Sequence, residues 1–119
     1  MLTILTYQTR ITNIGRIKTI GCEVTPTEID WGTLTPNQTA TKTIQITNNG
    51  TTNITLTYTT QEWNPPETEQ YITLTWNYTN QTIQPNQTTT IQLTLYIKPE
   101  IHDITNFQFT ITITATEVE

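Results

Sequence analysis

Hydrophobic and polar residues alternate with a period of two along most of this chain. From Ile72 to Thr79, apolar or aromatic residues occupy every second position, and threonine or asparagine fills the positions between them. This period predicts half-buried β-strands, and threonine suits the solvent side because its branched Cβ fits an extended backbone. The same pattern recurs at Thr43–Thr47, Thr52–Thr59, Ile91–Ile97 and Phe107–Ala115.

Turn signals separate these segments at the spacing expected of a β-sandwich. Asn48-Asn49-Gly50 predicts a tight hairpin between Thr43–Thr47 and Thr52–Thr59, because Asn-Gly tolerates the positive φ of such turns. Trp63-Asn64-Pro65-Pro66-Glu67 predicts a loop, and helix is expected only as a turn near Glu67–Gln70. The fold class is therefore all-β: an immunoglobulin-like antiparallel β-sandwich of seven to nine strands.

One phrase occurs twice. Leu34–Thr39 and Ile83–Thr88 share the letters Pro-Asn-Gln-Thr after an aliphatic residue, and each precedes an alternating segment. Proline followed by asparagine favours a β-turn, because proline fixes φ and asparagine tolerates the left-handed region. The repeat predicts the same structural corner in both sheets.

At 119 residues the chain fits a single domain, residues 1–119, with the core sandwich in residues 29–116. Residues 1–28 contain two further candidate strands, Leu2–Gln8 and Arg16–Val24, with Asn13-Ile14-Gly15 between them. These are either the first strands of the sandwich or include one that completes a neighbouring subunit.

If the first strand is exchanged, its apolar side chains form the contact between subunits. The residues expected at this interface are Leu2, Ile4 and Tyr7. The same segment lacks the basic start and apolar run of a signal peptide. A removed leader, a longer parent protein and synthesis without export are all compatible with that observation.

The surface is neutral and polar rather than charged. Charged residues make up 13% of the chain and the net charge is −5. The few basic residues are scattered, so nucleic acid is not an expected partner. No apolar run is long enough for a membrane-spanning segment. A surface of hydroxyl and amide groups is common on exported proteins and favours an extracellular or cell-surface location, or a virion if the protein is viral. Codon bias toward Thr, Asn and Ile is an alternative explanation of equal weight.

The inventory of reactive side chains argues against an enzyme. Serine is absent, and Cys22 and His102 are the single cysteine and histidine, so a Ser-His-Asp site is excluded and a Cys-His pair is a remote alternative. His102 beside Asp103 has no further ligand at metal spacing, and we expect a solvated loop pair. No catalytic, metal or cofactor-binding residue is predicted. The acids that would have to serve in glycoside hydrolysis, Glu62, Glu67, Glu69, Glu100 and Asp103, lie in expected loops.

Six Asn-x-Thr sequons offer attachment sites for N-linked glycans. Their number is about twice the chance expectation for a chain so rich in threonine. They fall on turns and on polar faces of strands, where a glycan can project. The predicted glycosylation residues are Asn37, Asn49, Asn53, Asn77, Asn80 and Asn86.

Aromatic residues suggest a second possible contact surface. Trp31 is expected in the core. Trp63 either caps the end of the sandwich or forms an exposed contact, and we favour the cap. A carbohydrate-binding or adhesion module would need an exposed platform built from Trp31, Trp63 or Trp76.

One stretch begins with Ile29-Asp30-Trp31-Gly32-Thr33-Leu34 and continues with Pro36-Asn37, Lys42, Ile44, Ile46, Asn48 and Gly50. It resembles the opening of Hydin-type immunoglobulin-like domains, relatives of the major sperm protein sandwich. The resemblance extends to about Thr116 and implies a scaffold or interaction domain without implying an activity. Within this family the chain is similar to Thr- and Asn-rich domains of archaeal secreted surface proteins, and it departs from the family in having asparagine rather than glycine at Asn37 and Asn86. The matching positions are Ile29-Asp30-Trp31-Gly32-Thr33-Leu34, Pro36-Asn37, Lys42, Ile44, Ile46, Asn48, Gly50, Ile83, Pro85, Ile91, Leu93, Leu95, Phe107, Phe109, Ile111 and Ile113.

These observations lead to one main hypothesis and two alternatives. The main hypothesis is a non-catalytic structural subunit of an extracellular assembly, a filament or pilus-like homopolymer joined by β-strand exchange. The alternatives are a virion structural protein and an adhesion or carbohydrate-binding module.

Overall fold

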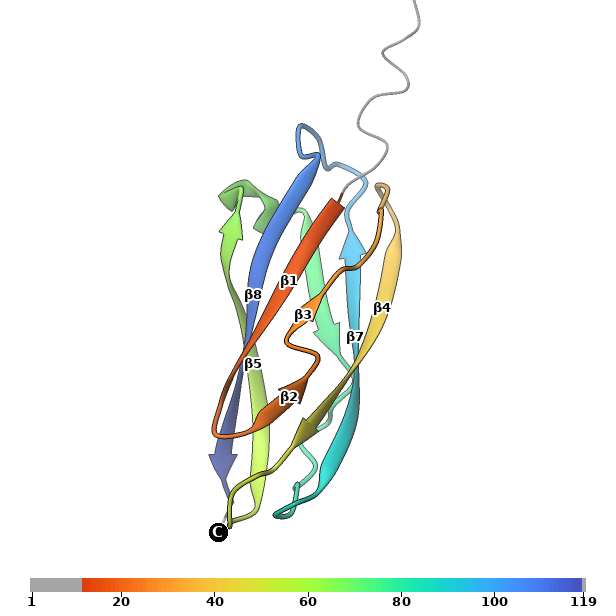
Figure 1. The fold of residues 1–119 in the computed structure, drawn as a ribbon. Helices are drawn as coiled ribbons and strands as arrows, with labels where there is room; N and C mark the ends of the chain where they lie inside the picture. Colours follow the sequence, from red (N-terminus) through yellow and green to blue (C-terminus); the bar gives the residue numbers. More distant parts are fainter. Residues whose placement is uncertain (1–11, 119) are drawn as a thin grey trace, which may run out of the picture.

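Eight strands and one short 3-10 helix form two packed sheets in the computed structural model, which describes residues 12–118 (Figure 1). One sheet has the strand order β3-β1-β8-β5, and the other has the order β2-β4-β7-β6. The fold class predicted from the alternating pattern is confirmed. The elements are β1 (Thr12–Ile20), β2 (Glu23–Thr25), β3 (Glu28–Ile29), β4 (Thr39–Thr47), β5 (Ile54–Asn64), η2 (Pro66–Gln70), β6 (Ile72–Trp76), β7 (Thr88–Ile97) and β8 (Asn106–Glu117).

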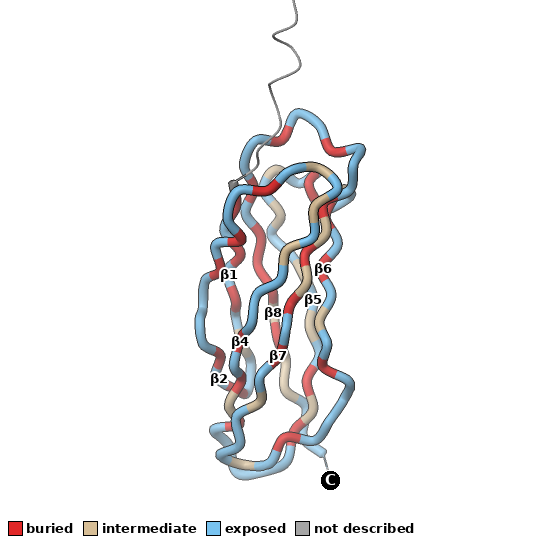
Figure 2. Tube along the Cα trace, turned by 90° about the vertical axis from the view of Figure 1, so that its right-hand side faces the viewer, coloured by how far each residue is buried: buried red, intermediate tan, exposed pale blue. Residues whose placement is uncertain are grey.

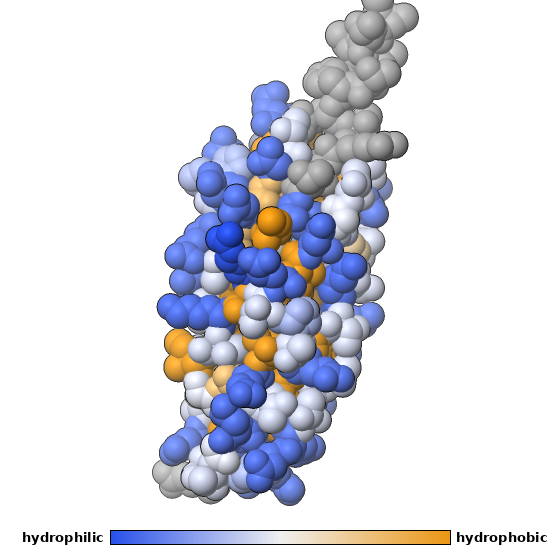
Figure 3. Space-filling model, in the orientation of Figure 1, coloured by the Kyte–Doolittle hydropathy of each residue, from blue (hydrophilic) through white to orange (hydrophobic). Residues whose placement is uncertain are grey.

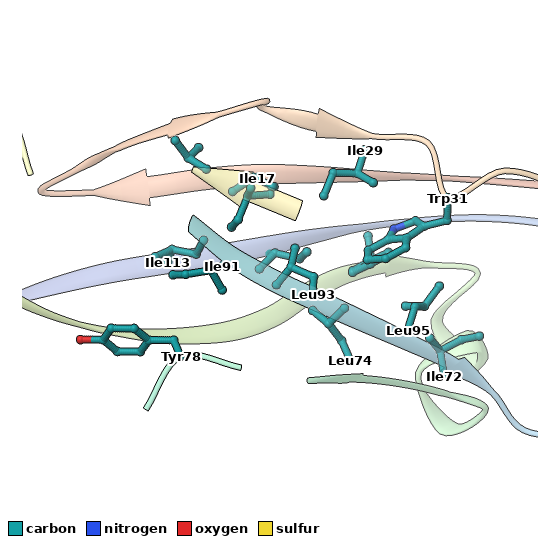
Figure 4. Close-up of a cluster of buried hydrophobic side chains, with 14 of the residues drawn as sticks. Ile17, Ile29, Trp31, Ile72, Leu74, Tyr78, Ile91, Leu93, Leu95 and Ile113 are labelled. Atoms are coloured by element: carbon teal, nitrogen blue, oxygen red, sulfur yellow. The ribbon is translucent and has the colours of Figure 1, made fainter. Parts of the chain in front are cut away.

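The alternating side chains meet between the two sheets. In β7, Ile91, Leu93, Leu95 and Ile97 are buried, and the residues between them are exposed or half-buried (Figure 2). Burying each such aliphatic side chain contributes about 1.5–3 kcal/mol. Figure 4 shows the β7 side chains meeting those of the opposite sheet, with the indole of Trp31 lying beside them. Trp31 is therefore a core residue, as expected.

β1 is an integral strand of the first sheet. It runs parallel to β8 from Thr12 to Ile20, a departure from the fully antiparallel arrangement expected, and β3 flanks its other side. The first and last strands are thus neighbours that run in the same direction. Residues 1–11, and with them the predicted strand Leu2–Gln8, lie outside the described part of the chain.

The prediction of a connection at Asn13-Ile14-Gly15 is wrong, because these residues lie within β1. Asn13 and Gly15 are residue types that are common in turns, but here they make tertiary contacts within the strand. The Asn13 Oδ1 accepts a hydrogen bond from the Trp31 backbone N–H, and its Nδ2 donates one to the Gly32 carbonyl, both 3.0 Å long. A Cβ on Gly15 would lie 3.1 Å from Trp31 Nε1, so a side chain there would require the indole to shift by a few tenths of an ångström. The chain turns instead at Gly21, where φ is +83°.

The predicted hairpin at Asn48-Asn49-Gly50 is also wrong. β4 pairs with β7 and β5 pairs with β8, so the connection between β4 and β5 crosses from one sheet to the other. Asn48 is fully buried and organises this crossing. Its Nδ2 donates to the carbonyls of Thr52 and Ile83, at 2.7 and 2.9 Å, and its Oδ1 accepts from the Gly50 N–H at 3.0 Å.

The two Pro-Asn-Gln-Thr corners have matching geometry. Asn37 and Asn86 have φ of 67° and 68°, and the Gln38 and Gln87 side chains accept hydrogen bonds from the N–H groups of Thr35 and Gln84. The expectation that they serve both sheets is wrong. They precede β4 and β7, the two central strands of one sheet, which pair antiparallel. The corners therefore sit at opposite ends of one strand pair, as a local two-fold axis requires.

β5 runs further than the sequence predicts. It includes Trp63 and Asn64, and its register with β8 shifts between Gln61 and Asn64. The shift places the Trp63 ring parallel to Phe109, with ring centroids 4.3 Å apart. Trp63 is half-buried against the core, which agrees with the cap we favoured.

Candidate interaction edge

The two long sides of the sandwich differ in how their strand edges are protected. An unpaired strand edge presents free N–H and C=O groups that another strand can bind. β5 and β6 form one side, and β1, β2, β3 and β4 form the other (Figures 1 and 2).

On the β5–β6 side, the free edges are closed by side chains and a bridge. The Leu56 N–H donates to the Tyr78 hydroxyl at 3.1 Å, and the Tyr58 hydroxyl donates to the Leu74 carbonyl at 2.8 Å. Ile54 and Ile83 exchange two backbone hydrogen bonds of 3.0 and 2.8 Å. These contacts and the β5 register shift leave little room for an added strand.

On the opposite side, β4 keeps an open edge. β2 pairs only with Gln45–Thr47, so within residues 12–118 no strand pairs with Thr39–Ile44 on the side away from β7. The Asn48 N–H donates to the Gln87 carbonyl, and the Asn48 carbonyl accepts from the Asn86 N–H, so the backbone groups of Asn48 point toward β7. Successive residues of a strand direct their backbone groups to alternate sides. Thr41 and Thr43 therefore direct their backbone groups to the open side. We call Thr39–Ile44 the β4 edge.

Lys42 lies in the middle of the β4 edge. It occupies an inward-facing position between Ala40 and Ile44, yet it is exposed, since no strand covers the sandwich there. A lysine on an edge strand discourages uncontrolled pairing while still permitting a partner that accommodates its charge. Figure 3 shows this side of the molecule, where apolar side chains gather among hydrophilic ones. The sequence analysis did not identify this edge; the charge at an inward position was the available signal.

The predicted glycosylation residues are all exposed. Asn77 lies level with Gln92 in the middle of β7, whereas Asn49, Asn53 and Asn86 lie at one end of the sandwich. We call this end, where β8 finishes, the C-terminal pole, and the end where β1 begins the N-terminal pole (Figure 1). The β4–β5 connection carries Asn49 and Asn53. The segment between β6 and β7 carries Asn77, Asn80 and Asn86, whereas Asn37 lies at the N-terminal pole.

Local contacts distinguish some of these asparagines. The Asn37 Oδ1 accepts a hydrogen bond from the Tyr96 hydroxyl at 2.8 Å, and the Asn77 Oδ1 accepts one from the Gln92 N–H at 2.9 Å. Asn80 has a positive φ of 71° at the tip of a turn.

Cys22 and His102, the pair weighed for nucleophilic catalysis, lie far apart. Cys22 follows the end of β1, and His102 lies before β8, near the other end of the same strand pair. β1 spans nine residues, so roughly 30 Å of strand separates them. His102 is exposed, with Nε2 4.0 Å from Asp103 and its ring packed edge-on against Tyr71. In the part of the chain that the structure describes, no group of three His, Cys, Asp or Glu could hold a metal ion.

Cys22 is buried in the bend between β1 and β2, and burial raises the pKa of its thiol. The neutral thiol is thus favoured in the folded state, and stability falls as the pH rises through the pKa of the unfolded thiol, about 8.5. We expect alkylation of native protein at pH 8 to be at least about tenfold slower than in denaturant. The protein is alkylated with iodoacetamide, the reaction is quenched at set times, and mass spectrometry gives the alkylated fraction. Equal alkylation rates in native and denatured protein would contradict the expectation.

The comparisons with known proteins agree with an immunoglobulin-like sandwich of the major-sperm-protein type. Residues 24–111 match the family described as inositol polyphosphate 5-phosphatase OCRL-like, ASH domain. The chain belongs to this family of ASH domains. The match does not distinguish the Hydin-type branch or archaeal surface proteins, which stay hypotheses. No curated protein matches the chain. In residues 12–118 there is no helix with the length and hydrophobicity to cross a membrane.

Proposed function

We propose that this ASH domain is a non-catalytic subunit of an extracellular homopolymer, in which residues 1–8 of one copy add as a strand to the β4 edge of the next. The open β4 edge carries this proposal, because the opposite side of the sandwich is closed by tyrosine hydroxyls and a backbone bridge. The ASH domain is a protein-interaction domain in OCRL-like proteins, which supports the coarser part of the proposal, a role in protein contact.

The dimensions of donor and acceptor match. Six residues of exposed edge span about 20 Å, and the seven residues Leu2–Gln8 span about 23 Å when extended. In such a strand, Leu2 and Ile4 point to the same face and Thr3 points to the other. The face that carries Leu2 and Ile4 would cover the open seam beside Ala40 and Ile44, whereas Tyr7, at an odd position, would point to the opposite face with Thr3.

The extracellular location rests on the exposed sequons. Asn49, Asn53 and Asn86 lie at the C-terminal pole, and the β4 edge begins near the N-terminal pole, so glycans at these three residues leave the edge accessible. Glycan occupancy also separates a secreted fibre from a virion protein assembled in the cytoplasm, which would carry unmodified asparagine.

The test compares two matched pairs of variants by light scattering and electron microscopy. Thr41→Pro removes an edge N–H that no strand within residues 12–118 pairs with, whereas Thr41→Val keeps it. Ile4→Asp places a charge on the donor face turned to the seam, whereas Thr3→Asp places it on the face turned away. We expect Thr41→Pro and Ile4→Asp to abolish multimers and the two controls to retain them.

Two results would count against this function. A wild-type protein that is monomeric at high concentration, with the Thr41 amide protected from hydrogen exchange, would mean that residues 1–8 close the edge of their own domain. Multimers that survive both disruptive variants would place the contact elsewhere on the surface.

A further inference from the structure

A hollow of about 360 Å³ lies between the edge strands β5 and β6, near the C-terminal pole. Its wall includes Leu56, Tyr58, Trp76 and Tyr78, and Asn80 and two threonines complete it. Among residues 12–118, no charged side chain lines the hollow. Its surroundings therefore suit a neutral ligand with both apolar and hydroxyl groups.

The aromatic rings in this wall are tilted against one another. Trp76 lies 4.5 Å from Tyr58 and 5.3 Å from Tyr78, measured between ring centroids, with interplanar angles of 58° and 65°. Neither tyrosine stacks flat on the indole, and Trp76 is only half-buried. The Tyr78 hydroxyl accepts a hydrogen bond from the Leu56 backbone N–H and the Tyr58 hydroxyl donates one to the Leu74 carbonyl, and these bonds hold the rings in place. The wall is thus a preformed aromatic surface.

Asn80 connects this surface to a modification motif. It starts the sequon Asn80-Gln81-Thr82, is exposed, and is the sequon asparagine that lines the hollow. The turn around it is fixed, because the Tyr78 hydroxyl donates to the Gln81 carbonyl and the Gln81 side chain accepts from the Thr79 N–H at 3.0 Å. A group attached to Asn80 is therefore held next to the rings.

We propose that the hollow holds the first sugar of an N-linked glycan attached to Asn80, an inference that rests on the export assumed in the proposed function. The Asn80 Nδ2 forms a bond to C1 of a sugar delivered as its polyprenyl diphosphate. The C1–O bond to the diphosphate breaks, the diphosphate leaves with the electron pair, and the amide proton passes to the transferase base.

The attached sugar would pack its polarised C–H groups against the electron-rich face of Trp76. Its hydroxyl groups would remain near Thr57 and Thr79, the two threonines of the wall. Because the sugar is tethered, it reaches the rings at high effective concentration and loses little freedom on docking. The glycan would then stabilise the β5–β6 seam.

The experiment secretes the full chain from a host that glycosylates Asn-x-Thr and trims each glycan to one sugar. Thr82→Ala removes the Asn80 sequon, and Thr51→Ala removes the exposed Asn49 sequon as a control. We expect Thr82→Ala to lower the unfolding midpoint by roughly 3 °C in secreted protein and by less than roughly 1 °C in protein made without a transferase. Thr51→Ala should have no effect in either host, and Trp76→Ala should abolish the stabilising effect of the Asn80 sugar.

The remaining outcomes each overturn the inference. Glycans on other sequons with Asn80 unmodified would leave export intact and exclude this site. An occupied Asn80 that stabilises Trp76→Ala as much as wild type would place the sugar in solvent. Tight binding of free N-acetylglucosamine to unglycosylated protein, monitored by tryptophan fluorescence, would indicate a site for an external saccharide. The absence of glycan at every sequon would reject both export and this site. The multimer test of the β4 edge does not depend on glycosylation and would still be valid.

Discussion

Replacing Asn48 with alanine is expected to destabilise the domain by about 3–4 kcal/mol. The substitution leaves the Thr52 and Ile83 carbonyls and the Gly50 N–H without their buried or part-buried partner. At roughly 4 °C per kcal/mol, the unfolding midpoint should fall by about 12–16 °C. Calorimetry or denaturant unfolding measures the change. Asn49→Ala is the matched control, because Asn49 is the exposed neighbour of Asn48, and a similar loss in both variants would contradict the role of the buried amide.

Asn48→Asp sharpens this test, because it keeps the acceptor and removes the two donors. The new carboxyl would face two carbonyl oxygens in a buried site, so its folded-state pKa would lie above its unfolded value. Stability would then be higher below the unfolded pKa and fall as the pH rises through it. We expect this variant to be more stable at pH 4 than at pH 7 relative to wild type.

Replacing Phe109 with alanine should destabilise the domain by about 4 kcal/mol. Phe109 is 1% exposed and stacks on Trp63 at 4.3 Å and 6°, with Phe107 6.0 Å away. Large-to-small changes in a core lose both burial and packing, typically 3–5 kcal/mol for phenylalanine. Urea titration followed by tryptophan fluorescence reports stability and the environment of Trp63 together. Gln108→Ala, on the exposed face of the same strand, should change stability by less than about 0.5 kcal/mol.

A second observation ties Phe109 to Gly15. A Cβ on Gly15 would lie 3.3 Å from the Phe109 ring and 3.1 Å from Trp31 Nε1. We expect Gly15→Ala to destabilise the wild type by about 1–2 kcal/mol and to cost less in a Phe109→Leu background, where part of the ring is gone. Additive effects in the double variant would mean that the ring does not restrict this position.

The proposed interaction edge and glycan site were only partly accessible from the sequence. The sequons could be read directly, because Asn-x-Thr is a local motif. The hollow beside Asn80 could not, because Tyr58 and Trp76 come from strands of different sheets. The β4 edge was likewise hidden, since it depends on β2 ending its pairing at Gln45.

The sequence by itself determined the class of fold, because a period of two assigns each side chain to the core or the solvent before any strand is placed. It also determined the two Pro-Asn corners, whose turn chemistry is local. Only the tertiary structure decided which strands pair: Asn48-Asn49-Gly50 crosses between sheets because Asn48 finds buried partners in Thr52 and Ile83. Asn13 and Gly15 likewise lie inside a strand. The Asn13 side-chain amide accepts a hydrogen bond from the Trp31 backbone N–H, and Gly15 has no Cβ to press against the indole. Contacts between residues far apart in the chain outweigh local turn preference, and a periodic pattern does not contain them.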